Sequence, residues 1–353
     1  MAADRRQVTL LGLLDLSAAF DCVDHLILLE RLRSAVGFTG VVLDWIESFL
    51  TDRTQQITCN GQLSMTQPVL FGVPQGSVLG PLLYVLYTAE LACVIANHGL
   101  KMHQYADDIQ VYISTTVNDA AATVDRFAAC LVDIEAWLSA SRLRLNPTKT
   151  QVMWLGSRQL LARLDISEVS VLSSTIRLQR TARDLGVEID DHLTMAAQVS
   201  AVCRSGYYQL RQLRPVLQNM SVDTIKTLVQ AFVTCRLDYC NSLYFGISDE
   251  LMKRLQSVQN AAARLVTGAR RFDHMTPVLR QLHWLPVRQR VDFKVATLVH
   301  RSLSGDAPTY LIDDCHLVAD VAGRRLRSAD NRECNVARTH SRLGDRAFAA
   351  AGP

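Results

Sequence analysis

The chain has 353 residues, 49% of them hydrophobic, and this length indicates two domains or one domain with an appendage. The apolar fraction excludes a disordered chain, and 17 Gly and 9 Pro exclude a collagen-like or low-complexity protein. Residues 1–200 carry 15 Lys and Arg against 21 Asp and Glu, whereas residues 201–353 carry 22 against 13. This asymmetry indicates either a carboxylate site beside a polyanion-binding surface or two ordinary solvated faces.

Targeting and membrane segments are not evident in the sequence. The longest uncharged stretch, 54–89, is interrupted by prolines and glycines, and its apolar core is short of the about 20 residues that a bilayer needs. The N-terminus has no apolar stretch of signal-peptide length. Nine cysteines without a Cys-x-x-Cys pair favour reduced, buried thiols. These features predict an intracellular protein, cytoplasmic or nuclear, with no membrane partner.

The first elements alternate between strand and helix patterns. The short apolar run from Val8 predicts a buried strand that ends near Asp15. Asp24 is a suitable N-cap for a helix that begins at His25, and a second short helix is predicted over residues 40–50. Asn60-Gly61 between β-favouring residues predicts a hairpin.

A Gly- and Pro-rich loop, residues 72–77, leads into an apolar helix that is predicted to end near Asn97. Residues 101–114 read as two strands around a tight turn, and Asn118 is predicted to cap a helix of about 20 residues. Short strands are predicted over residues 150–156, 174–179 and 184–189.

The pattern changes after about residue 195, where apolar positions recur at helical spacing and predict four or five helices. We therefore expect an α+β domain over 1–195, a helical domain over 196–305 and a poorly ordered polar tail over 306–353.

Acidic residues occur at two of these predicted junctions. Asp15 is expected at the end of the first strand, and Asp107-Asp108 at the turn of the later hairpin. Adjacent carboxylates repel each other unless a cation is present, and carboxylates from separate elements are what two divalent ions in phosphoryl transfer require. The alternative is that Asp107-Asp108 is simply a favourable turn dipeptide. The Gly72–Ser77 loop is either an ordinary loop or a place of close backbone approach to a nucleotide.

Taken in order, the segments DLSAAFDCVDH, GVPQGSVLGP and YADD resemble the palm signatures of reverse transcriptases. The residues in these segments are most similar to those in the enzymes of non-LTR (LINE-type) retrotransposons of the jockey-like branch. WLSASRLRLNPTKT resembles the next family motif, and DLGV at 184–187 resembles the segment that positions the primer. CRLDYCNSL and LHWLP extend the resemblance into the second half. It implies an α+β right-hand polymerase palm followed by an all-α, thumb-like domain.

The resemblance also implies a function and a set of site residues. The activity would be RNA-directed DNA polymerisation, in which a nucleotide is transferred from a dNTP to a DNA primer 3′-hydroxyl on an RNA template. Two Mg²⁺ ions, with Mn²⁺ as an alternative, would be the cofactors. The implied residues are catalytic Asp15, Asp107 and Asp108; metal-binding Asp15, Leu16 (by its carbonyl), Asp107 and Asp108; nucleotide-binding Phe20, Gln75, Gly76 and Lys149; and primer-binding Leu185 and Gly186.

One departure from the family pattern bears on activity. In the family a long segment that forms the fingers precedes the first motif, whereas 14 residues precede Asp15 here. From this we expect a fragment that lacks the fingers and endonuclease regions. Two hypotheses stay open: an RNA-directed DNA polymerase, or a catalytically inactive truncated remnant that at most binds nucleic acid through its basic helical half.

Overall fold

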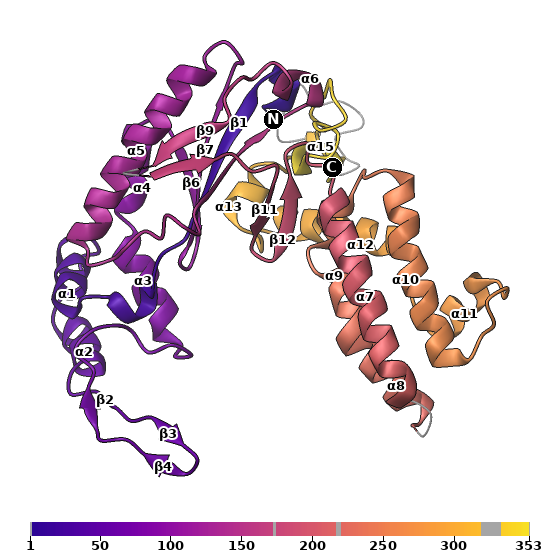
Figure 1. The fold of residues 1–353 in the computed structure, drawn as a ribbon, viewed down its shortest axis with the longest axis horizontal. Coiled ribbons are helices and arrows are strands. Elements are labelled where there is room, and N and C mark those ends of the chain that lie inside the picture. Colours follow the sequence, from indigo (N-terminus) through magenta and orange to yellow (C-terminus); the bar gives the residue numbers. More distant parts are fainter. Residues whose placement is uncertain (1, 172–173, 217–219, 319–332, 353) are drawn as a thin grey trace. The chain divides into compact units, whose positions relative to one another are not determined.

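The computed structural model describes residues 2–171, 174–216, 220–318 and 333–352 (Figure 1). The chain forms two compact units, each treated by itself below. The sheet unit comprises Val8–Leu155 and Gln159–Arg180, and the helical unit comprises Met1–Gln7, Gly156–Arg158 and Thr181–Pro353.

A four-stranded antiparallel sheet forms the centre of the sheet unit, in the order β6-β7-β1-β8. The strands are β1 (Val8–Leu14), β6 (Lys101–Tyr105), β7 (Asp108–Thr115) and β8 (Gln151–Leu155). β1 is hydrogen-bonded on both sides, and its residues are mostly buried. This burial explains the almost continuous apolar sequence that predicted the strand.

The helices and minor strands of the sheet unit follow the predicted order. They are α1 (His25–Ser34), α2 (Val41–Leu50), β2 (Thr54–Gln55), β3 (Thr58–Cys59), β4 (Gln62–Leu63), β5 (Gln67–Pro68), α3 (Leu79–Thr88), α4 (Leu91–Asn97), α5 (Ala120–Ala140), β9 (Glu168–Val171) and β10 (Ser174–Arg177). A short helix, α6 (Arg158–Leu161), lies where the chain passes between the units.

Several local predictions are confirmed and others are wrong in detail. The Asp24 carboxylate caps α1 by accepting the N–H groups of Leu26 and Ile27, and β3 pairs with β4 across Asn60-Gly61. The single apolar helix expected up to Asn97 is instead two helices, α3 and α4. The N-cap of α5 is Asp119 rather than Asn118, and β9 was not predicted.

One stretch passes a length and composition test that core helices of soluble proteins also pass, and the expectation about thiols needs correction. The stretch Leu79–Asn97 is apolar and long enough to cross a membrane by length and composition, and 39% of its most apolar window is buried in the fold. All nine cysteines are free, but Cys59, Cys93 and Cys235 are exposed, so the thiols are not uniformly buried as expected.

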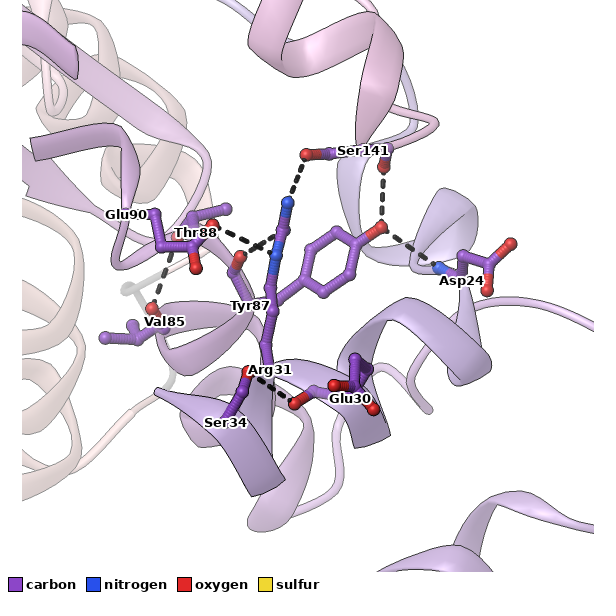
Figure 2. Close-up of polar contacts among 9 residues, drawn as sticks. All are labelled: Asp24, Glu30, Arg31, Ser34, Val85, Tyr87, Thr88, Glu90 and Ser141. Atoms are coloured by element: carbon purple, nitrogen blue, oxygen red, sulfur yellow. Dashed lines mark hydrogen bonds and ion pairs between the residues drawn. The ribbon is translucent and has the colours of Figure 1, made fainter. Parts of the chain in front are cut away.

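Arg31 of α1 joins α1 to the neighbouring helices (Figure 2). Its side chain, 13% exposed, donates hydrogen bonds of 2.7 Å to the Tyr87 carbonyl and to Ser141 Oγ, and forms an ion pair with Glu90 at 3.3 Å. The guanidinium also lies over the rings of Tyr87 and Trp137, at 4.8 and 4.6 Å from their centroids. These hydrogen bonds and both ring contacts depend on the orientation of the planar guanidinium. Arg31 therefore sets the relative placement of α1, α3 and α5.

The helical unit begins with a hairpin and continues as helices. Its elements are η1 (Ala3–Arg5), β11 (Thr181–Asp184), β12 (Val187–Asp190), α7 (Ala196–Val216), α8 (Val222–Val229), the π-helical turn η4 (Gln230–Thr234), α9 (Cys235–Asp238), η5 (Asn241–Tyr244), α10 (Asp249–Thr267), α11 (Met275–Gln281), α12 (Val287–Leu303), α13 (Thr309–Ile312) and α15 (Phe348–Ala351). Helix α10 packs against α7, α8 and α12 around a buried apolar core.

The hairpin β11–β12 contacts α7 and belongs with it to the helical unit. The domain boundary near residue 195 stays a prediction. Part of the tail expected over 306–353 lies outside the described residues, at 319–332 and 353. The described part holds α13 and α15. Ser341 Oγ also donates a 2.6 Å hydrogen bond to the Asp4 carboxylate.

Packing across the sheet predicts the effect of one substitution in β1. A Cβ at Gly12 would lie 2.5 Å from Cζ of Phe127 on α5, whose ring is fully buried. We expect Gly12→Ala to lower the free energy of unfolding by about 1–3 kcal/mol through overpacking, as measured by urea denaturation. Adding Phe127→Leu should recover part of this loss. A Gly12→Ala variant as stable as the wild type would contradict this packing.

Candidate active site

Asp15 lies immediately beyond the last residue of β1. Its carbonyl accepts a 2.8 Å hydrogen bond from the N–H of Asn146, and Leu16 forms an isolated antiparallel bridge with Leu145. The Ser17 N–H also donates to the Arg144 carbonyl at 2.9 Å. These bonds prolong the sheet past β1, so the backbone that carries Asp15 is held on the β8 side.

Asp107 and Asp108 lie at the tight turn between β6 and β7, as predicted. Tyr105 pairs with Asp108, which leaves Ala106 and Asp107 as a two-residue turn, and Ala106 has a φ of 55°. Leu14 pairs with Ile109 in the β1–β7 ladder. Asp15 is the residue after Leu14, and Asp108 is the residue before Ile109. The register therefore brings acids 92 residues apart in sequence to one edge of the sheet.

Gln104 anchors this turn, and sequence reasoning did not single it out. Its Nε2 donates to the Ala106 carbonyl at 2.8 Å and to Thr88 Oγ1 at 2.9 Å. Thr88 is fully buried in α3 and donates to the Tyr84 carbonyl. The turn that carries Asp107 is thus fastened to α3. Local sequence patterns do not show this contact, because it joins β6 to a helix that is 16 residues away in sequence.

Lys149 is close to the acids. Its Nζ forms an ion pair with Asp15 Oδ2 at 3.4 Å, and this carboxylate oxygen is buried without a hydrogen bond to any described residue. The turn before Lys149 is set by Asn146, whose Oδ1 accepts from the N–H and hydroxyl of Thr148. A buried carboxylate oxygen with a single exposed cationic partner is suited to a further cation. No three His, Cys, Asp or Glu side chains among the described residues are grouped as a metal site in this conformation.

Phe20, five residues after Asp15, stacks on Tyr84. Their ring centroids are 4.6 Å apart with an interplanar angle of 25°. Tyr84 is fully buried, and its hydroxyl has no hydrogen-bond partner among the described residues. Burial raises the pKa of Tyr84, and the negative charge of Asp107 raises it further.

The Gly72–Ser77 loop packs directly against the segment after Asp15. The Val73 N–H donates to the Phe20 carbonyl at 2.9 Å, and Gln75 Nε2 donates to Asp21 Oδ1 at 3.3 Å. Gly72 has a φ of 88°, and a Cβ there would lie 2.9 Å from Asp21 Cα. Glycine is therefore required by both conformation and space.

Gly76 and His25 play different parts in this loop. Gly76 has a φ of 81°, and the space around the position of its missing Cβ is open. A ligand can therefore approach the backbone there. The ring Nε2 of His25, the first residue of α1, is 2.8 Å from the Gly72 carbonyl and holds the loop to α1.

Leu185 and Gly186 lie in the helical unit, at the turn of the β11–β12 hairpin. Both have positive φ, 45° and 83°, as a tight two-residue hairpin turn requires. The Tyr239 hydroxyl donates a 2.6 Å hydrogen bond to the Leu185 carbonyl. The turn is therefore fastened to the end of α9. The primer-binding role of these two residues stays a prediction.

Two tyrosines on α3 offer a matched test of the packing beside the acids. Tyr87 Oη donates a 2.6 Å hydrogen bond to the Ser141 carbonyl, whereas the Tyr84 hydroxyl is buried without a partner among the described residues. We expect Tyr84→Phe to leave the free energy of unfolding unchanged or slightly higher, and Tyr87→Phe to lower it by about 1 kcal/mol. Urea denaturation measures both. Equal losses for the two variants would show that Tyr84 Oη is hydrogen-bonded.

Comparison with known proteins places this geometry in a family. The family described as reverse transcriptase (RNA-dependent DNA polymerase) matches residues 1–189. The probable RNA-directed DNA polymerase from transposon BS of Drosophila melanogaster is 28% identical over 79% of this chain and 31% of its own length. The RNA-directed DNA polymerase from the mobile element jockey of Drosophila funebris is 26% identical over 72% of this chain and 28% of its own.

Among solved structures, a Candida albicans telomerase in complex with a telomeric RNA fragment aligns with a TM-score of 0.37 and 12% identity, over 79% of this chain and 51% of that one. The chain spans about a third of the length of the curated relatives it matches. The family match covers more than half of the chain and includes the three motifs that carry the acids and the glycine loop. The chain therefore belongs to the reverse transcriptase family, and it is related to the polymerases of jockey-type Drosophila transposons.

Proposed function

We propose that this chain carries the polymerising site of an RNA-directed DNA polymerase, which joins a dNTP to the 3′-hydroxyl of a DNA primer on an RNA template. The observation that carries this proposal is the register of β1 with β7, which brings Asp15 to the turn of Asp107 and Asp108. Three carboxylates from two elements at one exposed edge are the hard oxygen donors that divalent cations prefer. No observation favours the inactive-remnant alternative.

Members of this family generally use divalent metal ions. The residues present fit such ions, because Asp15 Oδ2 is buried without a hydrogen bond and Asp107 lies at an adjacent turn. Asp15, Asp107 and Asp108, with the Leu16 carbonyl, would hold two Mg²⁺ ions or Mn²⁺ in their place. When bound, these ions activate the attacking hydroxyl and offset the charge of the leaving group.

The protein's own residues bind and orient the substrates. Phe20, on its Tyr84 support, offers a flat apolar surface beneath a deoxyribose, and it would collide with a 2′-hydroxyl. Gln75 and the open backbone at Gly76 would contact the nucleotide and template. Lys149 would exchange its ion pair with Asp15 for one with the triphosphate, because its exposed side chain is free to move.

The primer would be positioned by the Leu185-Gly186 turn of the β11–β12 hairpin. Its support is a tight turn with exposed backbone, fastened by Tyr239, which is the kind of rigid ledge that a nucleic-acid backbone can rest on. The basic second half of the chain, with nine Lys and Arg against two Asp in residues 251–300, would add phosphate contacts.

Metal binding and polymerisation test the proposal together. We expect the wild-type chain to bind Mn²⁺ by electron paramagnetic resonance titration. Asp15→Asn and Asp107→Asn should each weaken this binding and reduce Mg²⁺-dependent primer extension by about 100-fold or more, because a ligand charge is lost. The matched control is Asp125→Asn, an exposed carboxylate on α5, which should change neither. Mn²⁺ binding that is indifferent to Asp15 and Asp107 would overturn the proposed site.

Sugar discrimination tests the role of Phe20. We expect Phe20→Ala to increase ribonucleotide incorporation relative to deoxynucleotide by about 10-fold or more, since the steric barrier to the 2′-hydroxyl is removed. The control is Tyr84→Phe, which keeps the supporting ring and should keep the selectivity. The measurement is kcat/KM for a dNTP and for the matching rNTP. Unchanged selectivity in Phe20→Ala would assign discrimination to another residue.

A further inference from the structure

The helical unit contains a cavity of about 420 Å³ that the proposed polymerising site does not use. It is lined by the CRLDYCNSL and LHWLP segments, which the sequence resemblance brought forward without assigning them a role. The lining residues are Gln230, Thr234, Asp238, Asn241, His283, Trp284, Leu285, Arg290, Phe293 and Lys294. They come from η4, α9, η5, the loop after α11, and α12.

A buried acceptor without a partner marks this cavity as a site for a ligand. Asn241 is 5% exposed, and its Oδ1 makes no hydrogen bond to any described residue. A buried carbonyl oxygen loses its hydration on folding, so a donor is needed to recover that cost. The neighbouring Asp238 carboxylate forms an ion pair with Arg290. Asp238 is therefore already neutralised, whereas Asn241 is available to a donor from outside the chain.

The loop that carries the indole wall of the cavity is held in place by the side-chain amides of two glutamines on α10. Gln259, 1% exposed on α10, donates from Nε2 to the Leu285 carbonyl at 2.8 Å, and Gln256 Oε1 accepts the Val287 N–H at 2.9 Å. The backbone N–H of Trp284 donates to the Leu279 carbonyl at 2.8 Å. The backbone of Trp284 and of the residues that follow it is thus fixed before any ligand arrives, which lowers the entropy cost of binding.

The backbone at the opposite wall is irregular. Gln230 and Thr234 are the first and last residues of η4, a π-helical turn inserted between α8 and α9. Such turns are uncommon and occur often at functional sites, because the widened turn redirects the side chains that follow. Here the residues that follow are those of α9 and η5, which bring Asp238 and Asn241 to the cavity.

The chemistry of the lining selects the ligand. Trp284 and the 66% exposed Phe293 offer aromatic faces, Asn241 offers an acceptor to an N–H donor, and Lys294 adds a cation with no ion pair among the described residues. An apolar ligand would leave the Asn241 oxygen unsatisfied. A base inside a duplex has its faces stacked and its edges paired, so it can use neither wall.

We propose that this cavity binds one unpaired nucleotide of a single-stranded nucleic acid, with its base against Trp284 and Phe293, an amino group on Asn241 Oδ1 and a phosphate near Lys294. The inference rests on the proposed function only for its choice of a nucleic-acid partner. The same α9 segment carries Tyr239, which fastens the Leu185-Gly186 turn. An unpaired nucleotide held here is therefore connected, within the helical unit, to the predicted primer-positioning turn.

Binding of short labelled single strands, measured by fluorescence anisotropy with the full chain in EDTA, tests the aromatic wall. We expect Phe293→Ala to weaken binding of a cytosine strand by about 5-fold or more, as loss of base stacking does, and to leave an abasic strand unaffected. The matched control is Phe272→Ala, because Phe272 is 91% exposed and lies outside the cavity. Equal effects of the two variants on the cytosine strand would overturn the proposal.

A second pair of variants separates charge from base recognition. Lys294→Ala should reduce the magnitude of the slope of log affinity against log salt by about 0.7 for both the cytosine and the abasic strands. The matched control is Lys101→Ala, because Lys101 is exposed on β6 of the sheet unit, and this variant should leave the slope unchanged. Asn241→Leu should remove the preference for cytosine over uracil, which lacks the amino group. An unchanged preference in folded Asn241→Leu would contradict the assigned hydrogen bond.

Cross-linking identifies the site itself and its natural strand. Strands that carry 5-iodocytosine, in DNA and in RNA form, should cross-link on irradiation to the peptide that contains Trp284 or Phe293. The strand that cross-links in higher yield, DNA or RNA, shows which sugar the site prefers. Cross-links confined to other peptides would overturn the cavity as a binding site. Because EDTA removes divalent ions, Asp107→Asn should cross-link like the wild type, so this outcome is independent of the polymerising site.

Discussion

The antiparallel pairing of β1 with β7 is the constraint on which the candidate active site depends. Leu14 is opposite Ile109, so the chain that leaves β1 at Asp15 meets the chain that enters β7 at Asp108. A slip of one residue would turn Leu10 and Leu14 out of the core and move the carboxylates apart. Burial of the apolar faces therefore enforces the register, and the register brings the acids together.

The placement of α3 then determines how firmly the acidic turn is held. Gln104 fastens the turn to Thr88 at the end of α3, and the Tyr87 carbonyl on the same helix accepts from Arg31. Arg31 is largely desolvated between two aromatic rings, so its directional hydrogen bonds are made in a medium of low dielectric and are hard to replace. Arg31 on α1 thus supports the helix to which the turn of Asp107 is bonded, although it takes no part in the chemistry.

The helical unit uses side-chain amides where the sheet unit uses a largely buried guanidinium. Gln256 and Gln259 on α10 hold the loop that carries Trp284, while Tyr239 holds the Leu185-Gly186 turn. The CRLDYCNSL segment therefore serves two surfaces: Tyr239 faces the hairpin turn, and Asp238 and Asn241 line the cavity. These polar side chains fix the positions of loops and turns in the helical unit through hydrogen bonds.

The sequence by itself determined most of the order of strands and helices, the Asp24 cap and two tight hairpins, because these depend on local turn chemistry and apolar periodicity. Motif resemblance predicted the residues of the candidate site. The sequence did not reveal Arg31, Gln104 or the cavity around Asn241, since a lone arginine, glutamine or asparagine has no local signature. Tyr87, the partner of Arg31, is 56 residues away in sequence, and Thr88, the partner of Gln104, is 16 residues away. Only the tertiary structure brings these partners within hydrogen-bond distance. Likewise, the β11–β12 hairpin joined the helices because its side chains pack on α7, a choice that no local pattern encodes.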